Sequence, residues 1–414
     1  MTTTVIGGGV VGLSSALELL ERGEDVTVLE AAAVGQAASK GNAGWVTPFL
    51  STPRAAPGVV GDAVRSMTRR GGPARIHPHL TPAFAVWMLR FLRASRPAAH
   101  RRGHRALQRL AATAIGAFDR LAERKVVFEE HRQGLSVVAL SPATVAQYEQ
   151  LHTRMAAEGY CGRIRVLRGG EVCEFDPAIR RDVAGVVHLV DERHVRPETL
   201  TRGLTEAIRA RGGTVHEYSP VTGIAGVRGT WVVSTGNGLQ IASDRVVVAA
   251  GWRSRDLLRP LGVDLPLEAA RGTSLTARGE GTAPRHPLKL AEHMVACSPF
   301  DGEQVRLSGT FDVGARGARV NRRRLEAVVE QGMRYLEDWR PAEVCLEWVG
   351  HRPTTPDDLP VIGPVPGRPG LFVNTGHGTL GLTLGPTTGA LLAEEICASR
   401  PQELLSPFRI NRFW

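Results

Sequence analysis

The first thirty residues alternate between short apolar runs and turn residues. An apolar run at residues 3–6 precedes three closely spaced glycines, helically spaced apolar positions cover 10–22, and Gly23 separates them from a second run at 25–29. A period near two predicts strands and a period near 3.6 predicts a helix. The pattern therefore predicts a strand–helix–strand unit, followed by a loop rich in alanine, glycine and proline from 31 to about 61.

Three further stretches have the spacing of amphipathic helices. Thr81-Pro82 is typical of a helix start, and the apolar side chains that follow it share one helical face: Phe84, Trp87, Met88 and Phe91. A second helix is expected over about 104–125, and a third over 198–211, where Gly212-Gly213 ends it. Strands are expected at 214–216, 231–234, 245–249 and 371–374, and a last helix ends near 398.

Cysteine usage and apolar run lengths narrow the class of protein. The five cysteines are scattered and form no Cys-x-x-Cys pair, so we expect no disulfide framework, iron–sulfur cluster or metal site. No apolar run is long enough to span a bilayer. The first strand begins too early to leave room for a signal peptide before it. These observations predict a cytoplasmic protein.

The positive charge of the chain is concentrated in one segment. The formal net charge is +10, and Arg54–Arg109 holds 12 of the 51 basic residues but one of the 41 acidic ones, Asp62. The rest of the chain is therefore close to neutral. Such a segment attracts anionic partners, such as a membrane surface, a nucleic acid or an acidic protein.

The glycines after the first strand form a G-x-G-x-x-G motif at Gly7, Gly9 and Gly12. The first glycine permits a tight turn, the second lets the backbone approach a diphosphate, and the third lets the helix pack on the strand. Glu30 ends the second strand, where an acidic side chain binds ribose hydroxyls and disfavours a 2′-phosphate. The motif predicts a dinucleotide without separating NAD from FAD.

Motifs along nearly the whole chain resemble those of the D-amino-acid oxidase superfamily, and most closely the bacterial D-amino-acid dehydrogenases. The similar stretches include Ser39-Lys-Gly-Asn-Ala-Gly44, Ala56-Pro-Gly58, Arg271-Gly-Thr-Ser-Leu275, Arg306-Leu-Ser-Gly309, Gly350-His-Arg-Pro353 and Asn374-Thr-Gly-His-Gly-Thr-Leu-Gly381. One departure is Asp358, which stands where the family often has glycine. A turn that tolerates aspartate is expected there.

This resemblance implies an α/β protein with a discontinuous Rossmann-like FAD-binding domain and an α+β substrate domain with a mixed or antiparallel sheet. The FAD-binding domain is expected over 1–60, 185–260 and 345–414, and the substrate domain over 61–184 and 261–344. FAD is expected to be held noncovalently. The residues expected at FAD are Gly7, Gly9, Val11, Gly12, Glu30, Ser39, Asn42, Ala43, Val221, Ala250, Gly251, Gly376, Gly378, Thr379, Leu380 and Gly381.

The resemblance also implies a substrate clamp. Arg352 is expected to pair with a substrate carboxylate, because a guanidinium binds a carboxylate through two parallel hydrogen bonds. His377 is expected either to position the substrate or flavin, or only to pack. The implied reaction oxidises a D-amino acid, or a cyclic or secondary amino acid, by hydride transfer from Cα to the flavin. Glycine- or sarcosine-type, opine and hydroxy-D-proline oxidation remain alternatives.

The expected partners are an amino-acid substrate and an electron acceptor, which is a quinone, an electron carrier or O2. Arg54–Arg109 is interpreted either as a surface that docks on an anionic membrane or as an ordinary solvated face. A tRNA-modifying flavoenzyme is a rival of another class, but contact with nucleic acid is not expected, because the segment lacks interleaved surface aromatics. Lys289 and Glu292 are expected at solvated strand edges.

Overall fold

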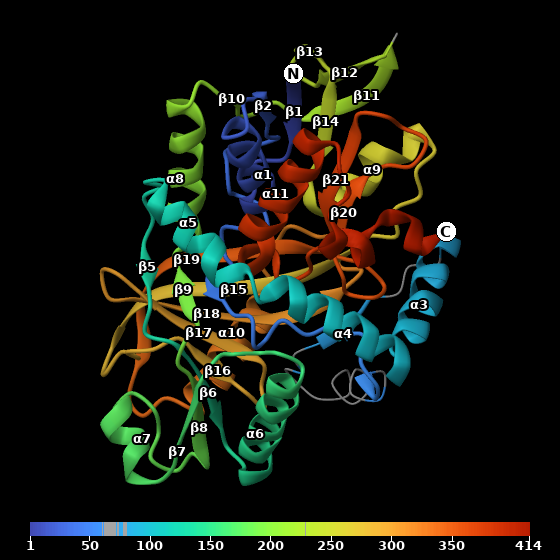
Figure 1. Cartoon of the computed structure of the whole chain (residues 1–414). Coiled ribbons are helices and arrows are strands. Elements are labelled where there is room, and N and C mark those ends of the chain that lie inside the picture. The colour runs from blue at the N-terminus through green and yellow to red at the C-terminus, as the bar shows by residue number, and fades with distance from the viewer. Residues whose placement is uncertain (60, 62–71, 73, 78–80, 228) are drawn as a thin grey trace.

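The computed structural model describes residues 1–59, 61, 72, 74–77, 81–227 and 229–414, and a mostly parallel sheet forms its upper part in Figure 1. Within the described residues this sheet has six strands, in the order β10–β2–β1–β14–β21–β20. All neighbours are parallel except β20 and β21. Their bounds are Thr214–His216, Asp25–Leu29, Thr2–Ile6, Arg245–Val248, Leu371–Thr375 and Val361–Pro364. The sheet therefore draws its strands from three separate parts of the chain.

Two helices of this region cross at very short range. Helix α1 (Val10–Leu20) packs on α11 (Gly381–Ala398), and Figure 1 shows them side by side. A Cβ added at Gly389 would lie 2.8 Å from the backbone carbon of Ser14, and one at Gly385 would lie 2.9 Å from Cγ1 of Val10. The two glycines thus permit an approach that a larger residue would block. This packing brings the N-termini of both helices to the same edge of the sheet.

A larger mixed sheet fills the centre and lower part of the molecule in Figure 1. Its order is β19–β15–β18–β17–β16–β6–β8–β7, with β4 beside β18, and the bounds are Arg340–Thr354, Glu268–Glu280, Gln304–Val313, Val295–Phe300, Leu288–Leu290, Leu135–Ala139, Gly185–Leu189, Ile164–Leu167 and Ala74–Ile76. Two smaller antiparallel sheets join β11–β12–β13 (Val221–Val227, Thr230–Thr235, Gln240–Ser243) and β3–β9–β5 (Trp45–Val46, Arg193–Val195, Glu130–His131). The expected fold class is confirmed.

The remaining helices surround the sheets: α3 (Pro82–Ala94), α4 (Pro97–Ala111), α5 (Ala114–Glu123), α6 (Pro142–Ala157), α7 (Gly170–Phe175), α8 (Pro197–Ala210), α9 (Ser254–Leu258) and α10 (Arg322–Met333). The expected face of α3 is buried, with Phe84 and Trp87 packed against Ala270. The prediction of a single helix over about 104–125 was wrong, because two helices cover this stretch: α4 starts earlier, at Pro97, and ends before α5 begins. At the junction the Thr113 hydroxyl donates to the Leu110 carbonyl, a bond that competes with helix continuation.

The expected division into a cofactor domain and a substrate domain remains a prediction, and the sheets to which β8 and β19 belong suggest where its boundaries lie. Strand β8 lies in the segment 185–260 expected for the cofactor domain, yet it pairs with β6 and β7 in the larger sheet. Strand β19 crosses the expected boundary at residue 345. We propose that the second cofactor segment begins after Leu189, the last residue of β8.

Candidate active site

A cavity of about 760 Å³ lies at the carboxyl ends of the parallel strands. Gly7 follows β1, Glu30 follows β2, Ala249 follows β14, and Thr375 ends β21, and all four residues line this cavity. Strand β1 lies between β2, the next strand along the chain, and β14, which comes from a distant part of the chain. Open α/β sheets bind ligands at this edge, where neighbouring connections depart in opposite directions. We call this space the larger cavity.

The glycine turn after β1 is fixed by steric contacts. Gly7 has φ 118°, and a Cβ there would lie 2.4 Å from the Ala249 carbonyl oxygen. A Cβ on Gly12 would lie 1.9 Å from the Gly7 carbonyl oxygen. The Ser39 hydroxyl accepts a hydrogen bond from the Val10 N–H at 3.2 Å. The turn therefore needs glycine at both positions and presents the N-terminus of α1 to the cavity, where phosphate oxygens bind favourably.

One end of the larger cavity carries a carboxylate. The Glu30 side chain accepts hydrogen bonds from the Gly8 N–H at 2.6 Å and from the Ala32 N–H at 3.1 Å. Pro220 and Val221 line the same cavity. These backbone bonds fix the orientation of the carboxylate, which is the arrangement that binds the hydroxyls of an adenosine ribose.

The N-terminus of α11 and His377 line the same cavity. Gly376 and Gly378 have φ values of 77° and 55°, which let the backbone turn sharply between β21 and α11. Nε2 of His377 hydrogen-bonds Oγ1 of Thr388 at 3.1 Å. Burial lowers the pKa of His377 to about 3, so its imidazole is neutral at physiological pH. This geometry supports a positioning role better than proton transfer.

Most of the predicted site residues lie around two adjoining cavities. The larger cavity is lined by Gly7, Gly9, Val11, Glu30, Ser39, Asn42, Val221, Ala250, Gly251, Arg352, His377, Gly378 and Gly381. The smaller one is lined by Asn42, Ala43, Arg352, Thr379 and Leu380. Gly12 and Gly376 line neither cavity; Gly12 lies behind Gly7. Direct contact of these residues with a ligand remains a prediction.

The smaller cavity has a volume of about 180 Å³, which suits a small molecule. Its apolar wall includes Trp45, Leu50, Met294, Phe311 and Trp348. Its positively charged residues are Arg54, Lys289 and Arg352. The larger and smaller cavities share Arg352, so this side chain lies where they meet.

A β-bulge places the Arg352 guanidinium. Arg271 pairs with Asp312 and Thr273 pairs with Gly309, so Gly272 of β15 faces the two residues Thr310 and Phe311 of β18. Such bulges often redirect groups next to active sites. Thr310 has φ 61°, an unfavourable conformation for a β-branched residue, and its carbonyl accepts from Nη1 of Arg352 at 2.9 Å.

Glycine at position 272 leaves room for that guanidinium. A Cβ on Gly272 would lie 2.3 Å from Nη1 of Arg352. Burial, and then the neighbouring Arg54, lower the pKa of Arg352 to about 9, so the group remains cationic at neutral pH. A largely desolvated guanidinium of this kind is stabilised by an anionic ligand.

Arg54 is a site residue that sequence reasoning missed. We interpreted it as the start of a solvent-facing basic segment, but it lines the smaller cavity. Its Nη2 donates to Oγ1 of Thr379 at 2.7 Å, and its guanidinium carbon lies 4.3 Å from the centre of the Phe311 ring. Its Nη1 is buried and has no hydrogen-bond partner among the described residues.

The unusual aspartate of the sequence explains how Arg54 is held. Asp358 has φ 56° and is buried, and its Oδ2 accepts from the backbone N–H of Arg54 at 2.7 Å. Aspartate is among the few residues that adopt this left-handed conformation at low cost. The departure from glycine was therefore the signal in the sequence that could have pointed to Arg54. Lys289 was expected at a solvated strand edge, but it lies in the wall of the smaller cavity.

A buried arginine supports the loop that carries Ser39 and Asn42. Nη1 of Arg306 donates to the carbonyl oxygens of Lys40 and Asn42 at 3.1 and 2.9 Å. The same guanidinium forms an ion pair with Glu198 on α8. Arg306 is 1% exposed, so it ties the two regions together from the interior.

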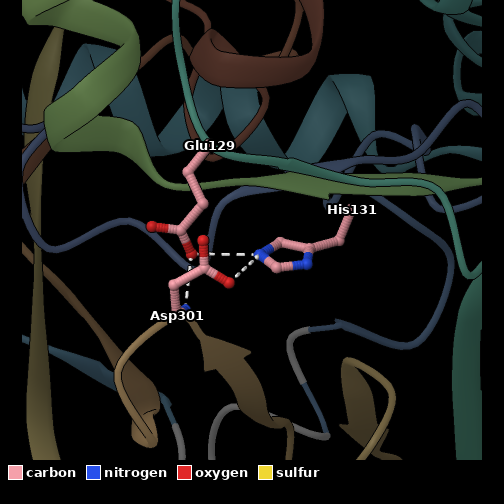
Figure 2. Close-up of side chains that lie close together, drawn as sticks. All are labelled: Glu129, His131 and Asp301. Carbon is pink, nitrogen blue, oxygen red and sulfur yellow. Dashed lines mark hydrogen bonds and ion pairs between the residues drawn. The ribbon is translucent and has the colours of Figure 1, made fainter.

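Three side chains of types that can ligate a metal lie together elsewhere in the molecule. Donor atoms of Glu129, His131 and Asp301 lie within 4.8 Å of one another. Figure 2 shows these three side chains close together. Glu129 already binds Nε2 of His131 at 3.0 Å, the Asp301 N–H at 2.8 Å and Arg196 at 3.3 Å. None of the three residues lines the larger or smaller cavity. We interpret the cluster as an ion-pair network, because a guanidinium beside the carboxylate disfavours a cation.

Comparisons with known proteins identify the family. The family model for FAD-dependent oxidoreductases of the DAO type matches residues 2–395, and the chain belongs to this family. A D-amino acid dehydrogenase of Methylobacterium nodulans is 32% identical, over 97% of this chain and 96% of the relative. D-amino acid dehydrogenase 2 of Pseudomonas aeruginosa is also 32% identical, over 95% and 94%. The structure of glycine oxidase from Geobacillus kaustophilus has a TM-score of 0.79 at 22% identity, covering 99% and 98%.

FAD is the cofactor of this family, and the residues of the larger cavity fit it. The cavity has the oriented carboxylate of Glu30, the N-termini of α1 and α11, and a turn that a Cβ on Gly7 would fill. The buried Oδ1 of Asn374, in the same wall, has no partner among the described residues and can accept a bond from a ligand. Helices of the described residues fall short of the length and apolar character that crossing a membrane requires.

Proposed function

We propose that this chain oxidises a small amino acid at its Cα–N bond. The observation that carries the proposal is Arg352, a half-buried arginine at the junction of the FAD-sized cavity and the small one. A carboxylate bound there through two parallel hydrogen bonds would leave the rest of an amino acid in the smaller cavity. The names of the 32%-identical relatives support D-amino acids as the substrate class.

Each part of the site has a physical role in this reaction. Arg352 fixes the substrate carboxylate and therefore the face of Cα that is presented to the larger cavity. Phe311 and Trp348 exclude water from the smaller cavity, which strengthens that ion pair. The N-terminus of α11 directs its partial positive charge into the larger cavity. When FAD is bound, it supplies an acceptor for the hydride that leaves Cα.

Proton transfer does not require a side chain of the smaller cavity. Among the described residues that line it, none is histidine, aspartate or glutamate. Hydride loss from Cα needs the lone pair of the nitrogen, so the substrate amine would react in its neutral form. The imino acid formed would hydrolyse to a keto acid and ammonia, or stay cyclic. Glycine or sarcosine, opines and hydroxy-D-proline are alternative substrates that would use the same clamp.

Anaerobic reduction of the holoenzyme tests this function. D-amino acids, their L-enantiomers, sarcosine, an opine and hydroxy-D-proline would each be mixed with the protein in the absence of oxygen. We expect at least one to bleach the visible absorption of the flavin, with D favoured over L. If no member of this panel bleaches it, the proposal is wrong. Reoxidation by air or by a quinone analogue then distinguishes an oxidase from a dehydrogenase.

We also propose that the reduced enzyme passes its electrons to an acceptor at an anionic membrane. Helices α3 and α4 and the turn between them carry exposed apolar and basic side chains: Val86, Leu89, Leu92, Arg93, Arg96, Arg101, Arg102 and Arg105. Leu89 is 57% exposed. Exposed apolar residues ringed by arginines are typical of peripheral membrane binding. Three arginines of the segment (Arg65, Arg69 and Arg70) lie outside the described residues.

Sedimentation with vesicles tests the docking surface. We expect binding to anionic vesicles at low salt, little binding to zwitterionic vesicles, and release as salt is added. Leu89→Glu should weaken the binding. Val344→Glu is the matched control, because Val344 is 54% exposed on β19, in another part of the molecule. If Leu89→Glu binds anionic vesicles as well as the Val344 variant does, docking through α3 is refuted.

A further inference from the structure

We infer that the substrate carries a second carboxylate, which Arg54 binds while Arg352 binds the first. This inference rests on the proposed function and narrows its substrate to amino dicarboxylates. It is carried by the Arg54 side chain, whose Nη1 is buried in the wall of the smaller cavity and lacks a partner among the described residues. A buried guanidinium with an unused donor costs free energy unless a ligand satisfies it.

The two guanidinium groups share one aromatic neighbour. The guanidinium carbon of Arg54 lies 4.3 Å from the centre of the Phe311 ring, and that of Arg352 lies 5.9 Å from it. The two carbons therefore lie no more than about 10 Å apart. A single short molecule can reach both groups within a cavity of about 180 Å³. The same distances suit a compact dicarboxylate better than a long cationic or aromatic side chain.

The described residues that line the smaller cavity carry positive charge only, because the acidic residues nearest its arginines, Asp312 and Asp358, lie behind the wall. Among its described lining residues, Arg54, Arg352 and Lys289 are basic and none is acidic. Behind the wall, Asp312 pairs with Arg324 at 2.5 Å and Arg271 at 3.5 Å. Asp358 uses one carboxylate oxygen to accept the Arg54 backbone N–H. Two carboxylates on the substrate would place negative charge inside the cavity, directly against the basic side chains of its wall.

Asp358 is a positioning residue in this arrangement. Its hydrogen bond fixes the backbone of Arg54, and the bond from Arg54 Nη2 to Thr379 fixes the side chain at 2.7 Å. Nη1 is then the guanidinium nitrogen that lacks a partner among the described residues. Holding the side chain at both ends lowers the entropy that binding would otherwise cost.

A third cavity, next to the smaller cavity, has basic side chains that would attract an anionic molecule. A cavity of about 220 Å³ shares Leu50 and Lys289 with the smaller cavity, and the exposed Arg154 lines it. Basic side chains along an approach raise the local concentration of anions and the rate of binding.

Matched substrate pairs test the inference in the wild-type holoenzyme. D-glutamate and D-glutamine differ by one carboxylate, and so do iminodiacetate and sarcosine. We expect the member with two carboxylates to reduce the flavin anaerobically with a kcat/KM about 100-fold higher in at least one pair. If the monocarboxylates react as well as the dicarboxylates, the inference is wrong and the proposed function stands. If nothing reduces the flavin, the proposed function itself fails.

Substitution of Arg54 assigns the preference to this residue. Arg54→Met should bring the ratio of kcat/KM within the preferred pair close to one, and Arg54→Lys should restore part of it. Arg202→Met, which removes an exposed arginine from α8, is the charge-matched control and should keep the wild-type ratio. An Arg54→Met variant that keeps the wild-type ratio would overturn the assignment.

A binding measurement covers the case in which Arg54 variants fold poorly. Succinate and butyrate have the same chain length but differ by one carboxylate. We expect succinate to raise the melting temperature of the wild-type holoenzyme at concentrations where butyrate does not, and added salt to weaken the effect. Equal shifts with both acids would overturn the inference without reference to turnover.

Discussion

Replacing the buried Glu192 with glutamine is expected to stabilise the protein, and more strongly as the pH rises. Burial raises the pKa of Glu192 to about 7 from an ordinary value of about 4.5, although Thr47, Phe49 and Tyr160 donate hydrogen bonds to it. A carboxyl group with a raised pKa supports the fold in full only below about pH 4.5, and this support is lost as the pH rises to about 7. Glutamine has no proton to lose and avoids this penalty.

The size of the effect follows from those two pKa values. Each pH unit between them corresponds to about 1.4 kcal/mol, so the full difference is about 3 kcal/mol at pH 8 and under 1 kcal/mol at pH 5. With an unfolding entropy of roughly 2 cal/mol/K per residue over 414 residues, 3 kcal/mol corresponds to about 3–4 °C in melting temperature. Oε1 of glutamine can still accept from the Phe49 N–H and the Tyr160 hydroxyl, at 3.1 and 2.9 Å in the native protein.

Thermal or urea unfolding of wild type and variant at several pH values measures this difference. Glu129→Gln is the matched control with the opposite sign. Despite burial, hydrogen bonds from His131, the Asp301 N–H and Arg196 lower the pKa of Glu129 to about 2. Its support is present above about pH 4.5 and is lost as the pH falls toward 2, so Glu129→Gln should destabilise at both pH 5 and pH 8. The loss should be larger at pH 5, because Glu129 raises the pKa of His131 and the protonated imidazole of this ion pair is lost as the pH rises. A Glu192→Gln advantage that does not grow between those pH values would refute the reasoning.

Further variants test the two cavities. Arg352→Met should lower kcat/KM by about 10²–10³-fold, mainly through KM, because it leaves the substrate carboxylate unpaired; steady-state kinetics with the best substrate of the panel would measure this. Gly12→Ala should weaken FAD binding and lower the melting temperature, because its Cβ meets the Gly7 carbonyl, whereas Gly223→Ala meets nothing within 4 Å and should leave both unchanged. His377→Asn should keep the shape of the pH profile of kcat/KM, because the imidazole is already neutral.

The half of the fold built around the glycine turn was well predicted, because its signals are local. The period of the apolar positions and the turn at Gly7 depend on neighbouring residues, and β1, α1 and β2 formed close to the expected positions. The break between α4 and α5 was missed, because the apolar stripe from Leu107 to Leu121 continues across it and both ends are buried. Periodicity therefore recorded the buried face but not the local hydrogen bond of Thr113 that interrupts the helix.

The substrate side of the site was less predictable, because long-range pairing builds it. Arg352 was expected from its motif, but its placement depends on a bulge opposite Gly272 in another strand. Arg54 and Asp358, which holds its backbone, are 304 residues apart in the sequence. Charge counting grouped Arg54 with the arginines of α3 and α4, although Arg54 lines a cavity and most of those arginines are exposed. Composition alone does not distinguish these environments.

The most direct test of the proposed chemistry is anaerobic mixing of the holoenzyme with an amino acid that carries either hydrogen or deuterium at Cα. We predict that the flavin absorption bleaches in both cases and that deuterium slows the bleaching, because the Cα–H bond breaks as the flavin is reduced. We further predict that Arg352→Met needs a much higher amino-acid concentration for the same rate. Flavin that stays oxidised with every amino acid tried, or a reduction rate that does not depend on deuterium at Cα, would contradict this mechanism.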